Sequence, residues 1–190
     1  MYDPRRHSSV DTSSPVVGTL LVAHPSMKDP NFHRTVVFLA AHDQVNGSLG
    51  LVMNRPMDQT LSESDPGYAS SALADLPLYH GGPVAAEKLI LAAWRWLEDT
   101  GTFQLYFGSD GERAASLGQD PSFQVAGFMG HAGWTEGQLD LELEQNAWLL
   151  SRSLPELMCC GREEVWRNLL LHEQPEMLLL LDVPEDPSLN

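Results

Sequence analysis

Short runs of apolar residues, separated by polar or glycine- and proline-rich stretches, predict a domain built largely from strands. Several runs are rich in β-branched residues or alternate between apolar and polar positions, as buried and half-buried strands do. Residues 88–96 fit a strand or a helix, and their mixture of aromatic and β-branched residues favours the strand. The pattern predicts strands over residues 16–23, 34–41, 48–53, 88–96, 103–107, 123–129 and 147–150.

Helical periodicity is clearest over residues 162–172, near the end of the chain. The apolar residues Val165, Trp166, Leu169 and Leu170 fall on one side of a helix there. Two shorter helices are predicted from composition and from an Asp cap at the start of the second one. They cover residues 62–76 and 110–117.

Residues 135–145 carry two conflicting patterns. Leu139, Leu141 and Leu143 alternate with acidic residues, which favours a strand. The spacing of Thr135 and Gln138 is that of a capping box, and the Gln, Leu and Glu composition favours a helix. We expect a helix over this segment.

Turn signals indicate how the strands connect. Asn46-Gly47 separates two predicted strands and is a strong hairpin signal, whereas Pro56 ends the second strand because proline cannot continue a central strand. Strands and helices are interleaved, so we expect an α+β fold with a mainly antiparallel sheet. A single domain is expected over residues 16–181, between a flexible arm at 1–15 and an acidic, proline-broken tail at 182–190.

The chain is strongly acidic, with 26 Asp and Glu residues against 11 Lys and Arg residues and a formal net charge of −15. This balance makes direct nucleic-acid binding unfavourable, because a phosphate backbone is bound by clustered cations. It also argues against docking on anionic lipid. We expect no contact with membranes, since no apolar run has the length of a spanning helix and the N-terminal segment lacks the apolar region of a secretory signal.

Cysteine usage favours a cytoplasmic protein. The two cysteines, Cys159 and Cys160, are adjacent, and neighbouring cysteines rarely reach disulfide geometry. A reducing compartment fits this usage. A redox or metal site at the pair is the less favoured alternative, because no second cysteine pair completes a zinc site.

The chain lacks the usual sequence patterns of catalytic and cofactor sites. Its seven histidines form no metal-binding pair at helical spacing, and there is no G-x-S-x-G elbow, phosphate-binding loop or dinucleotide fingerprint. We therefore expect no metal and no cofactor. The nearest acid–base group places Glu136, Asp140, Glu142 and Glu144 beside His131, and a solvated acidic helix face is the favoured interpretation.

The most informative stretch is GHAGWTEGQL, residues 130–139. Its glycines indicate a backbone that bends sharply or lies against another segment. Together with the capping box, it predicts a tight turn that leads into a helix N-terminus, where an anion or a partner backbone can bind. A crowded corner that only fixes the fold is the alternative. We expect this stretch to lie near Asn54-Arg55-Pro56.

Two arginines are a second candidate for binding. Arg55 follows a predicted strand and offers a bidentate guanidinium, and Arg34 lies beside the Asn31-Phe32-His33 loop. Either side chain could hold a carboxylate or a phosphate. Internal pairing is favoured, because the chain contains 26 acidic residues.

These blocks together resemble the bacterial AlgH/YqgE family. The similarity is carried by residues 18–25, 29–37, 47–56, 81–84, 130–134 and 137–139, with Glu142 and Trp148. It implies a compact α+β fold with a bent, pseudo-barrel-like sheet. It also implies cytoplasmic bacterial proteins, one of which is linked by name to transcriptional control of alginate production. It supplies no established enzyme activity, and His131 stands where family members often carry tyrosine.

We therefore expect a regulatory or interaction protein that binds an unidentified protein or small ligand rather than DNA. The alternative is a hydrolase or transferase, in which Arg55 and the residues near Thr135 hold a small anionic substrate and His131 or Glu142 acts as the acid or base. The candidate surface consists of Asn31, Phe32, Arg34, Asn54, Arg55, Pro56, Gly81, Gly82, Pro83, Gly130, His131, Gly133, Trp134, Gln138 and Glu142.

Overall fold

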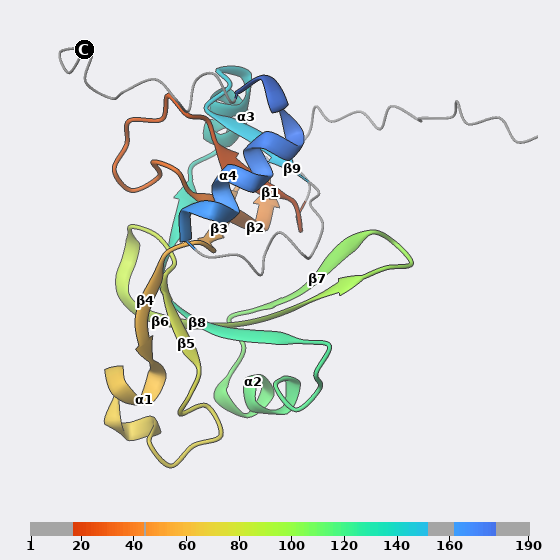
Figure 1. Ribbon diagram of the computed structural model, residues 1–190. Coiled ribbons are helices and arrows are strands. Elements are labelled where there is room, and N and C mark those ends of the chain that lie inside the picture. Colours follow the sequence, from red (N-terminus) through yellow and green to blue (C-terminus); the bar gives the residue numbers. More distant parts are fainter. Residues whose placement is uncertain (1–16, 44, 152–161, 178–190) are drawn as a thin grey trace, which may run out of the picture.

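The computed structural model describes residues 17–43, 45–151 and 162–177, which form a single α+β domain around one curled sheet (Figure 1). The described strands are β1 (Leu20–Ala23), β2 (Val36–Asp43), β3 (Gly47–Val52), β4 (Pro56–Thr60), β5 (Pro77–His80), β6 (Val84–Leu97), β7 (Thr102–Phe107), β8 (Gln124–Trp134) and β9 (Trp148–Ser151). The described α-helices are α1 (Leu61–Ser64), α2 (Gly111–Leu117), α3 (Gln138–Glu144) and α4 (Arg162–Glu173), and short 3-10 turns lie at Pro66–Tyr68 and Pro175–Met177.

Strand β8 connects the two halves of the sheet. One of its edges pairs with β5 and then, further along, with β3, while its other edge pairs with β6. Strands β3, β2, β1 and β9 follow in that order on one side, and β4 and β7 extend the other half. The described strand pairs are antiparallel except β5 with β8, which confirms the expected mainly antiparallel sheet.

The two halves are covered by different helices. Figure 1 shows α3 and α4 beside β1, β2, β3 and β9, and α1 and α2 beside the half that contains β4 to β7. The predicted apolar side of α4 is confirmed, because Val165, Trp166, Leu169 and Leu170 are all buried in the main core. The Trp166 indole N–H donates a hydrogen bond of 2.7 Å to the Ala23 carbonyl, so α4 is also tied directly to β1.

The hairpin predicted at Asn46-Gly47 is confirmed as the β2–β3 connection. Gly47 has a φ of 86°, a left-handed value that glycine adopts without strain. The Asp43 carboxylate accepts backbone hydrogen bonds from Val45 and Asn46, at 2.9 and 2.7 Å. These bonds favour the charged carboxylate and lower the pKa of Asp43.

Several other predictions are confirmed with small shifts of boundary. The ambiguous residues 88–96 lie within strand β6, and the strands expected at 48–53, 103–107, 123–129 and 147–150 correspond to β3, β7, β8 and β9. The Asp110 side chain caps α2 by accepting from the Arg113 backbone N–H at 2.8 Å. The predicted arm and tail, like Cys159 and Cys160, lie outside the described residues.

The helix expected over residues 62–76 is wrong in length. Only Leu61–Ser64 is α-helical, and a 3-10 turn follows it. Pro66 and Gly67 explain the break, because proline disfavours helix in the residue before it and the Asp65 side chain accepts from the Gly67 N–H at 2.9 Å. The segment then continues as turns, so composition alone overestimated the helix.

The first two predicted strands began too early. Strand β1 starts at Leu20, after Gly18 has turned the backbone with a φ of 92°. Strand β2 starts at Val36 because Arg34 has a φ of 53°, which is incompatible with an extended strand. Both corrections come from left-handed residues that the apolar pattern does not reveal.

The tight turn predicted at the start of residues 130–139 is also wrong. Residues 130–134 are the last part of β8, and residues 132–134 pair with β3, from Gly50–Ala132 to Ser48–Trp134. The glycines serve close backbone approach instead of reversal. A Cβ atom on Gly81 would collide with the Gly130 carbonyl oxygen, and one on Gly82 would collide with the His131 backbone.

This contact, which we call the glycine crossing, consists of Gly81, Gly82, Gly130 and His131. The Gly81 N–H donates to the Met129 carbonyl at 2.8 Å, and the Gly81 carbonyl accepts from the Val52 N–H at 2.9 Å. Gly81 therefore links the end of β3 to the middle of β8. The two halves of the sheet meet at this point.

Among the described residues, none of the helices combines the length and the apolar character that crossing a bilayer requires.

We expect Gly81→Ala to lower the free energy of unfolding by about 3 kcal/mol, because overpacking against rigid backbone cannot be relieved by moving a side chain. Gly111→Ala is the matched control. An added methyl at Gly111 meets only Leu73 at 3.7 Å, and stability should stay unchanged or rise slightly. Urea unfolding of both variants measures the two free energies of unfolding. An equal loss in the two variants would contradict the claim that the backbone at Gly81 leaves no room for a side chain.

Candidate functional site

The structure brings the predicted segments together around the loop between β1 and β2. Phe32 of that loop packs on Trp134 at the end of β8, with ring centroids 6.2 Å apart. Arg55 also reaches the loop, and its own carbonyl accepts from the His80 N–H at 2.9 Å. The expected proximity of residues 130–139 and Asn54-Arg55-Pro56 is therefore confirmed through β5 and this loop. We call the combined region, residues 28–34, 54–56, 81–83 and 130–138, the loop surface.

Asn54 fixes the backbone of the loop. Its side chain is buried, with 5% exposed, and its Oδ1 accepts from the Val36 N–H at 2.8 Å. Its Nδ2 donates to the Arg34 carbonyl at 2.9 Å. Arg34 has the left-handed φ of 53°, which is uncommon for a residue of this size. Asn54 thus holds the chain at the one position of the loop where the backbone is strained.

Arg55 binds backbone carbonyls, so the favoured prediction of pairing with an acid is wrong. Its Nη2 donates to the carbonyls of Pro30 and His33, both at 3.0 Å. Burial lowers the pKa of Arg55, and the nearby Asp29 charge partly opposes that shift. Arg34 lies over the Trp166 ring, with 5.6 Å from its Cζ to the ring centroid. Each arginine is therefore positioned by the fold, through carbonyls or through an aromatic face.

Further hydrogen bonds order the loop itself. The His33 Nδ1 donates to the Met27 carbonyl at 2.8 Å, and Asp29 accepts from the Asn31 N–H at 2.8 Å. Thr35 closes the end of the loop by donating from its hydroxyl to the Phe32 carbonyl at 2.8 Å. The loop is thus held from within as well as by Asn54 and Arg55.

Three aromatic rings form the floor beneath the loop. Phe32 meets Trp148 edge-on at 5.5 Å, and Trp134 meets Trp148 edge-on at 5.9 Å. These distances and angles are those at which aromatic pairs attract each other beyond their burial. Trp148 was absent from the predicted site, although a tryptophan on a predicted buried strand must find an acceptor for its indole N–H.

Glu142 receives both indole N–H groups. Its Oε2 accepts from Trp134 at 2.9 Å and from Trp148 at 2.7 Å. Its Oε1 accepts from the side-chain amide of Gln138, four residues earlier in the sequence, at 2.9 Å. The carboxylate therefore joins α3, β8 and β9 into one cluster. The predicted solvated face is wrong for Glu142, which turns inward.

The predicted capping box is only half correct. The Gln138 Oε1 accepts from the Thr135 N–H at 3.0 Å, as a capping box requires. The helix, however, starts at Gln138 itself, and Gly137 takes the cap position with a φ of 67°. Thr135 is therefore a turn residue before the helix. Gln138 is the first residue of α3, and its side chain orders the turn before the helix. Because α3 starts only at Gln138, it is seven residues long.

Of the three residues of the acid–base hypothesis, Arg55 and Glu142 are bonded to other partners. Among the described residues, no hydrogen bond or ion pair joins any two of His131, Glu142 and Arg55. His131 is half-buried beside Val84, and burial lowers its pKa. Within the described ranges, no three His, Cys, Asp or Glu side chains come together as metal ligands would.

The remaining predicted residues have structural positions. Pro56 starts β4, Pro83 is exposed after the glycine crossing, and Gly133 is exposed on β8. Asn31 is exposed at the tip of the loop. These positions leave Asn31, Pro83 and Gly133 accessible to a partner, whereas Asn54, Trp134 and Glu142 support the surface from beneath.

We expect Glu142→Gln to lower the free energy of unfolding by about 2 kcal/mol, since hydrogen bonds to a charged group contribute roughly 1.5–3 kcal/mol and the new amide NH₂ would face a donor. Glu144→Gln on the same helix is the control, and its effect should stay within about 0.5 kcal/mol because Glu144 is exposed. Urea unfolding followed by tryptophan fluorescence measures both. Equal stability of the two variants would mean that the carboxylate does not hold the indoles.

Comparison with known proteins agrees with this architecture. A family model described as AlgH-like matches residues 20–177. A UPF0301 protein from Streptomyces avermitilis is 34% identical over 196 residues, which cover 96% of this chain and 100% of the relative. A UPF0301 protein from Thermobifida fusca is 31% identical over 189 residues, covering 92% and 96% of the two chains.

Solved structures show the same fold. The solution structure of the AlgH protein from Pseudomonas aeruginosa aligns with a TM-score of 0.61 and 27% identity, covering 92% of this chain and 98% of that one. A crystal structure of a Corynebacterium diphtheriae protein aligns with a TM-score of 0.66 and 24% identity, covering 97% and 100%. The similarity extends over essentially the whole described domain, and the chain belongs to the AlgH-like family.

Proposed function

We propose that this protein is a non-enzymatic interaction protein that binds an anionic group of a protein or small ligand through the loop surface. The observation that carries the proposal is the placement of Arg55. One nitrogen of its guanidinium is held by two carbonyls, and no described residue bonds to the other two nitrogens. An arginine fixed in this way keeps its Nε and Nη1 donors, and its positive charge, available to a carboxylate or a phosphate.

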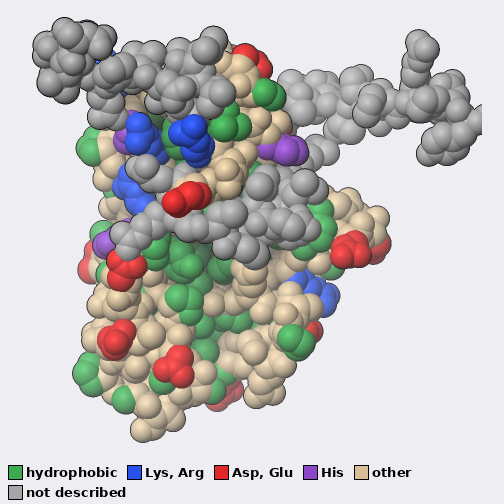
Figure 2. Space-filling model, viewed as in Figure 1, with side chains coloured by type: hydrophobic (Ala, Val, Ile, Leu, Met, Phe, Trp, Pro, Cys, Tyr) green, Lys and Arg blue, Asp and Glu red, His purple; other side chains and the backbone are tan. Residues whose placement is uncertain are grey.

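Further cations lie near Arg55 despite the acidic composition of the chain. Lys28 and Arg34 belong to the loop that Arg55 contacts, and Lys28 is exposed. Figure 2 shows most of the Lys and Arg side chains of this face gathered in its upper half, around this loop and α4. A local group of cations attracts anions to that place. The acidic side chains elsewhere on this chain, whose net charge is −15, repel them.

The rigidity of the loop surface also supports a binding role. Asn54, the Arg55 guanidinium and the aromatic floor hold the loop in one conformation. A surface that is ordered before binding loses less conformational entropy when a partner arrives. The cytoplasm is the compartment that we propose, from the cysteine usage and the family resemblance.

We expect a titration of ¹⁵N-labelled protein with an acidic oligopeptide and, separately, with inorganic phosphate to shift the amides of residues 28–34 and 131–135. Arg55→Lys keeps the charge but loses the planar fork, and should weaken binding about tenfold, a change of roughly 1.4 kcal/mol. Arg113→Lys is the matched control, because Arg113 lies over Tyr106 in the other half of the sheet.

Lys28→Gln provides a second test that leaves the Arg55 contacts intact, and it should weaken binding by less than Arg55→Lys does. Shifts that map away from the loop surface, or equal affinities of the Arg55→Lys and Arg113→Lys variants, would contradict the proposal. A response to the peptide but not to phosphate identifies a protein partner, and the reverse identifies a small ligand.

Any regulatory role would act through such a partner and not through DNA. We expect no salt-sensitive, sequence-selective shift of duplex DNA in a gel-mobility assay with the purified protein, because the net charge opposes binding to the phosphate backbone. Tight, selective binding in that assay would overturn this part of the proposal.

A further inference from the structure

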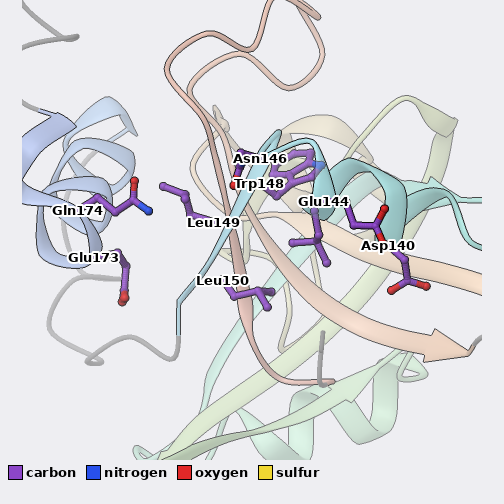
Figure 3. A pocket seen from close by; sticks show the side chains of 9 residues that line it. Asp140, Glu144, Asn146, Trp148, Leu149, Leu150, Glu173 and Gln174 are labelled. Carbon is purple, nitrogen blue, oxygen red and sulfur yellow. The ribbon is translucent and has the colours of Figure 1, made fainter. Parts of the chain in front are cut away.

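A hollow lies apart from the arginines of the loop surface, between α3, β9 and the end of α4. Its volume is about 600 Å³, within the range of roughly 300–1,000 Å³ that is usual for binding pockets. Figure 3 shows Asp140 and Glu144 on one side of it, Glu173 and Gln174 on the other, and residues of β9 between them. We call this hollow the acidic groove.

The bottom of the acidic groove is apolar. Leu143 of α3 and Leu149 and Leu150 of β9 line it together with Trp148. The Trp148 indole N–H is already bonded to Glu142, so this ring has no free donor to offer a polar ligand. The bottom of the groove therefore suits apolar side chains.

Both walls of the groove carry carboxylates. Glu173 accepts from the Ser151 hydroxyl at 2.8 Å and lies 3.4 Å from the His172 Nδ1. In the described part of the chain, no donor or cation is bonded to Asp140 or Glu144. The described lining residues also include no Lys, Arg or His. The charges of Asp140 and Glu144 are thus not compensated by the described fold.

Asp140 lies in the first turn of α3, where an acid is favourable, but its spacing from Glu144 and the position of Glu144 disfavour the helix. Asp140 and Glu144 are four residues apart, and like charges at this spacing repel each other on a helix surface. Glu144 is also the last residue of α3, near the negative end of the helix dipole, where an acid is unfavourable. The placement of Glu144 is therefore explained better by an external cation than by the stability of the helix.

We infer that the acidic groove binds a basic, amphipathic segment of a partner protein. Apolar side chains of the segment would rest on Leu143, Leu149 and Leu150, and flanking Lys or Arg side chains would reach the carboxylates on the two walls. An amphipathic helix that lies in an apolar groove is a common mode of recognition, and long basic side chains keep their charged ends at the rim. A single metal ion is a poorer occupant, because it would fill little of the 600 Å³ and would make no contact with the apolar bottom.

This inference concerns a different surface from Arg55 and does not rest on the anionic ligand proposed above. The probe is a synthetic fourteen-residue helical peptide with leucines along one face and lysines on both flanks of that face. Two comparison peptides replace the leucines by serine or the lysines by glutamate. Binding to the full chain is measured by calorimetry and by ¹⁵N NMR, including the Trp148 indole signal.

We expect the leucine–lysine peptide alone to bind and to shift signals of residues 140–150 and 173–174. The double variant Asp140→Asn/Glu144→Gln should weaken this binding at least tenfold, while its melting temperature stays unchanged or rises. The control Asp75→Asn/Glu87→Gln removes two exposed acids elsewhere, so the net charge of the two variants is the same.

Equal weakening in the two double variants would show only a general attraction to an acidic protein and would overturn the inference. Equal binding of the serine–lysine peptide, or shifts confined to other parts of the chain, would also overturn it. Leu150→Ala offers a further check on the apolar bottom, since Leu150 is only partly buried, the substitution leaves every charge in place, and it should weaken binding of the leucine–lysine peptide.

Discussion

The close passage of the backbone at Gly81 and Gly82 over Gly130 and His131 is the constraint on which the rest of the structure depends. No side chain can be accommodated between these segments, because a Cβ atom on either Gly81 or Gly82 would overlap the opposite backbone. Through its N–H and carbonyl, Gly81 connects Met129 on β8 with Val52 on β3. Along this edge of β8, the pairing partner therefore changes from β5 to β3, and a single sheet runs through both halves of the domain.

The loop surface follows from this arrangement. The part of β8 beyond the crossing places Trp134 under the β1–β2 loop, where Phe32 packs on it. The β3–β4 connection carries Asn54 and Arg55 to the same loop. Glu142 then ties Trp134 to Trp148 and so fixes α3 against both strands. Helix α3 has a double role, because one side supports the loop surface and another side forms a wall of the acidic groove.

The sequence predicted the elements whose signals are local. The hairpin at Asn46-Gly47, the cap at Asp110 and the apolar side of α4 each depend on residues a few positions apart. The sequence also identified the segments that meet at the loop surface, through their glycines, prolines and polar residues and through the family resemblance. The segment lengths were less predictable where a left-handed residue such as Arg34 interrupts an apolar run.

The roles of the site residues could not be predicted, because they depend on contacts between distant parts of the chain. Residues 130–134 have the composition of a turn, and only their position beside Gly81 and Gly82 shows that the glycines permit close packing in a strand. The sequence pattern predicts Glu142 as one of several solvated acids, whereas two tryptophans from β8 and β9 donate to it. Likewise, the 26 acidic residues of the chain favour an acid as the partner of Arg55, yet its guanidinium donates to the carbonyls of Pro30 and His33.

The most direct test of this account is native-state hydrogen exchange at the amides of Val52 and Gly81, which donate the two hydrogen bonds of the crossing. If the crossing holds the two halves of the sheet together, both amides should exchange only through global unfolding, with opening free energies within about 1 kcal/mol of that of the core strands. Exchange of either amide through a local opening several kcal/mol lower would show that the halves separate without unfolding, and would contradict the central claim.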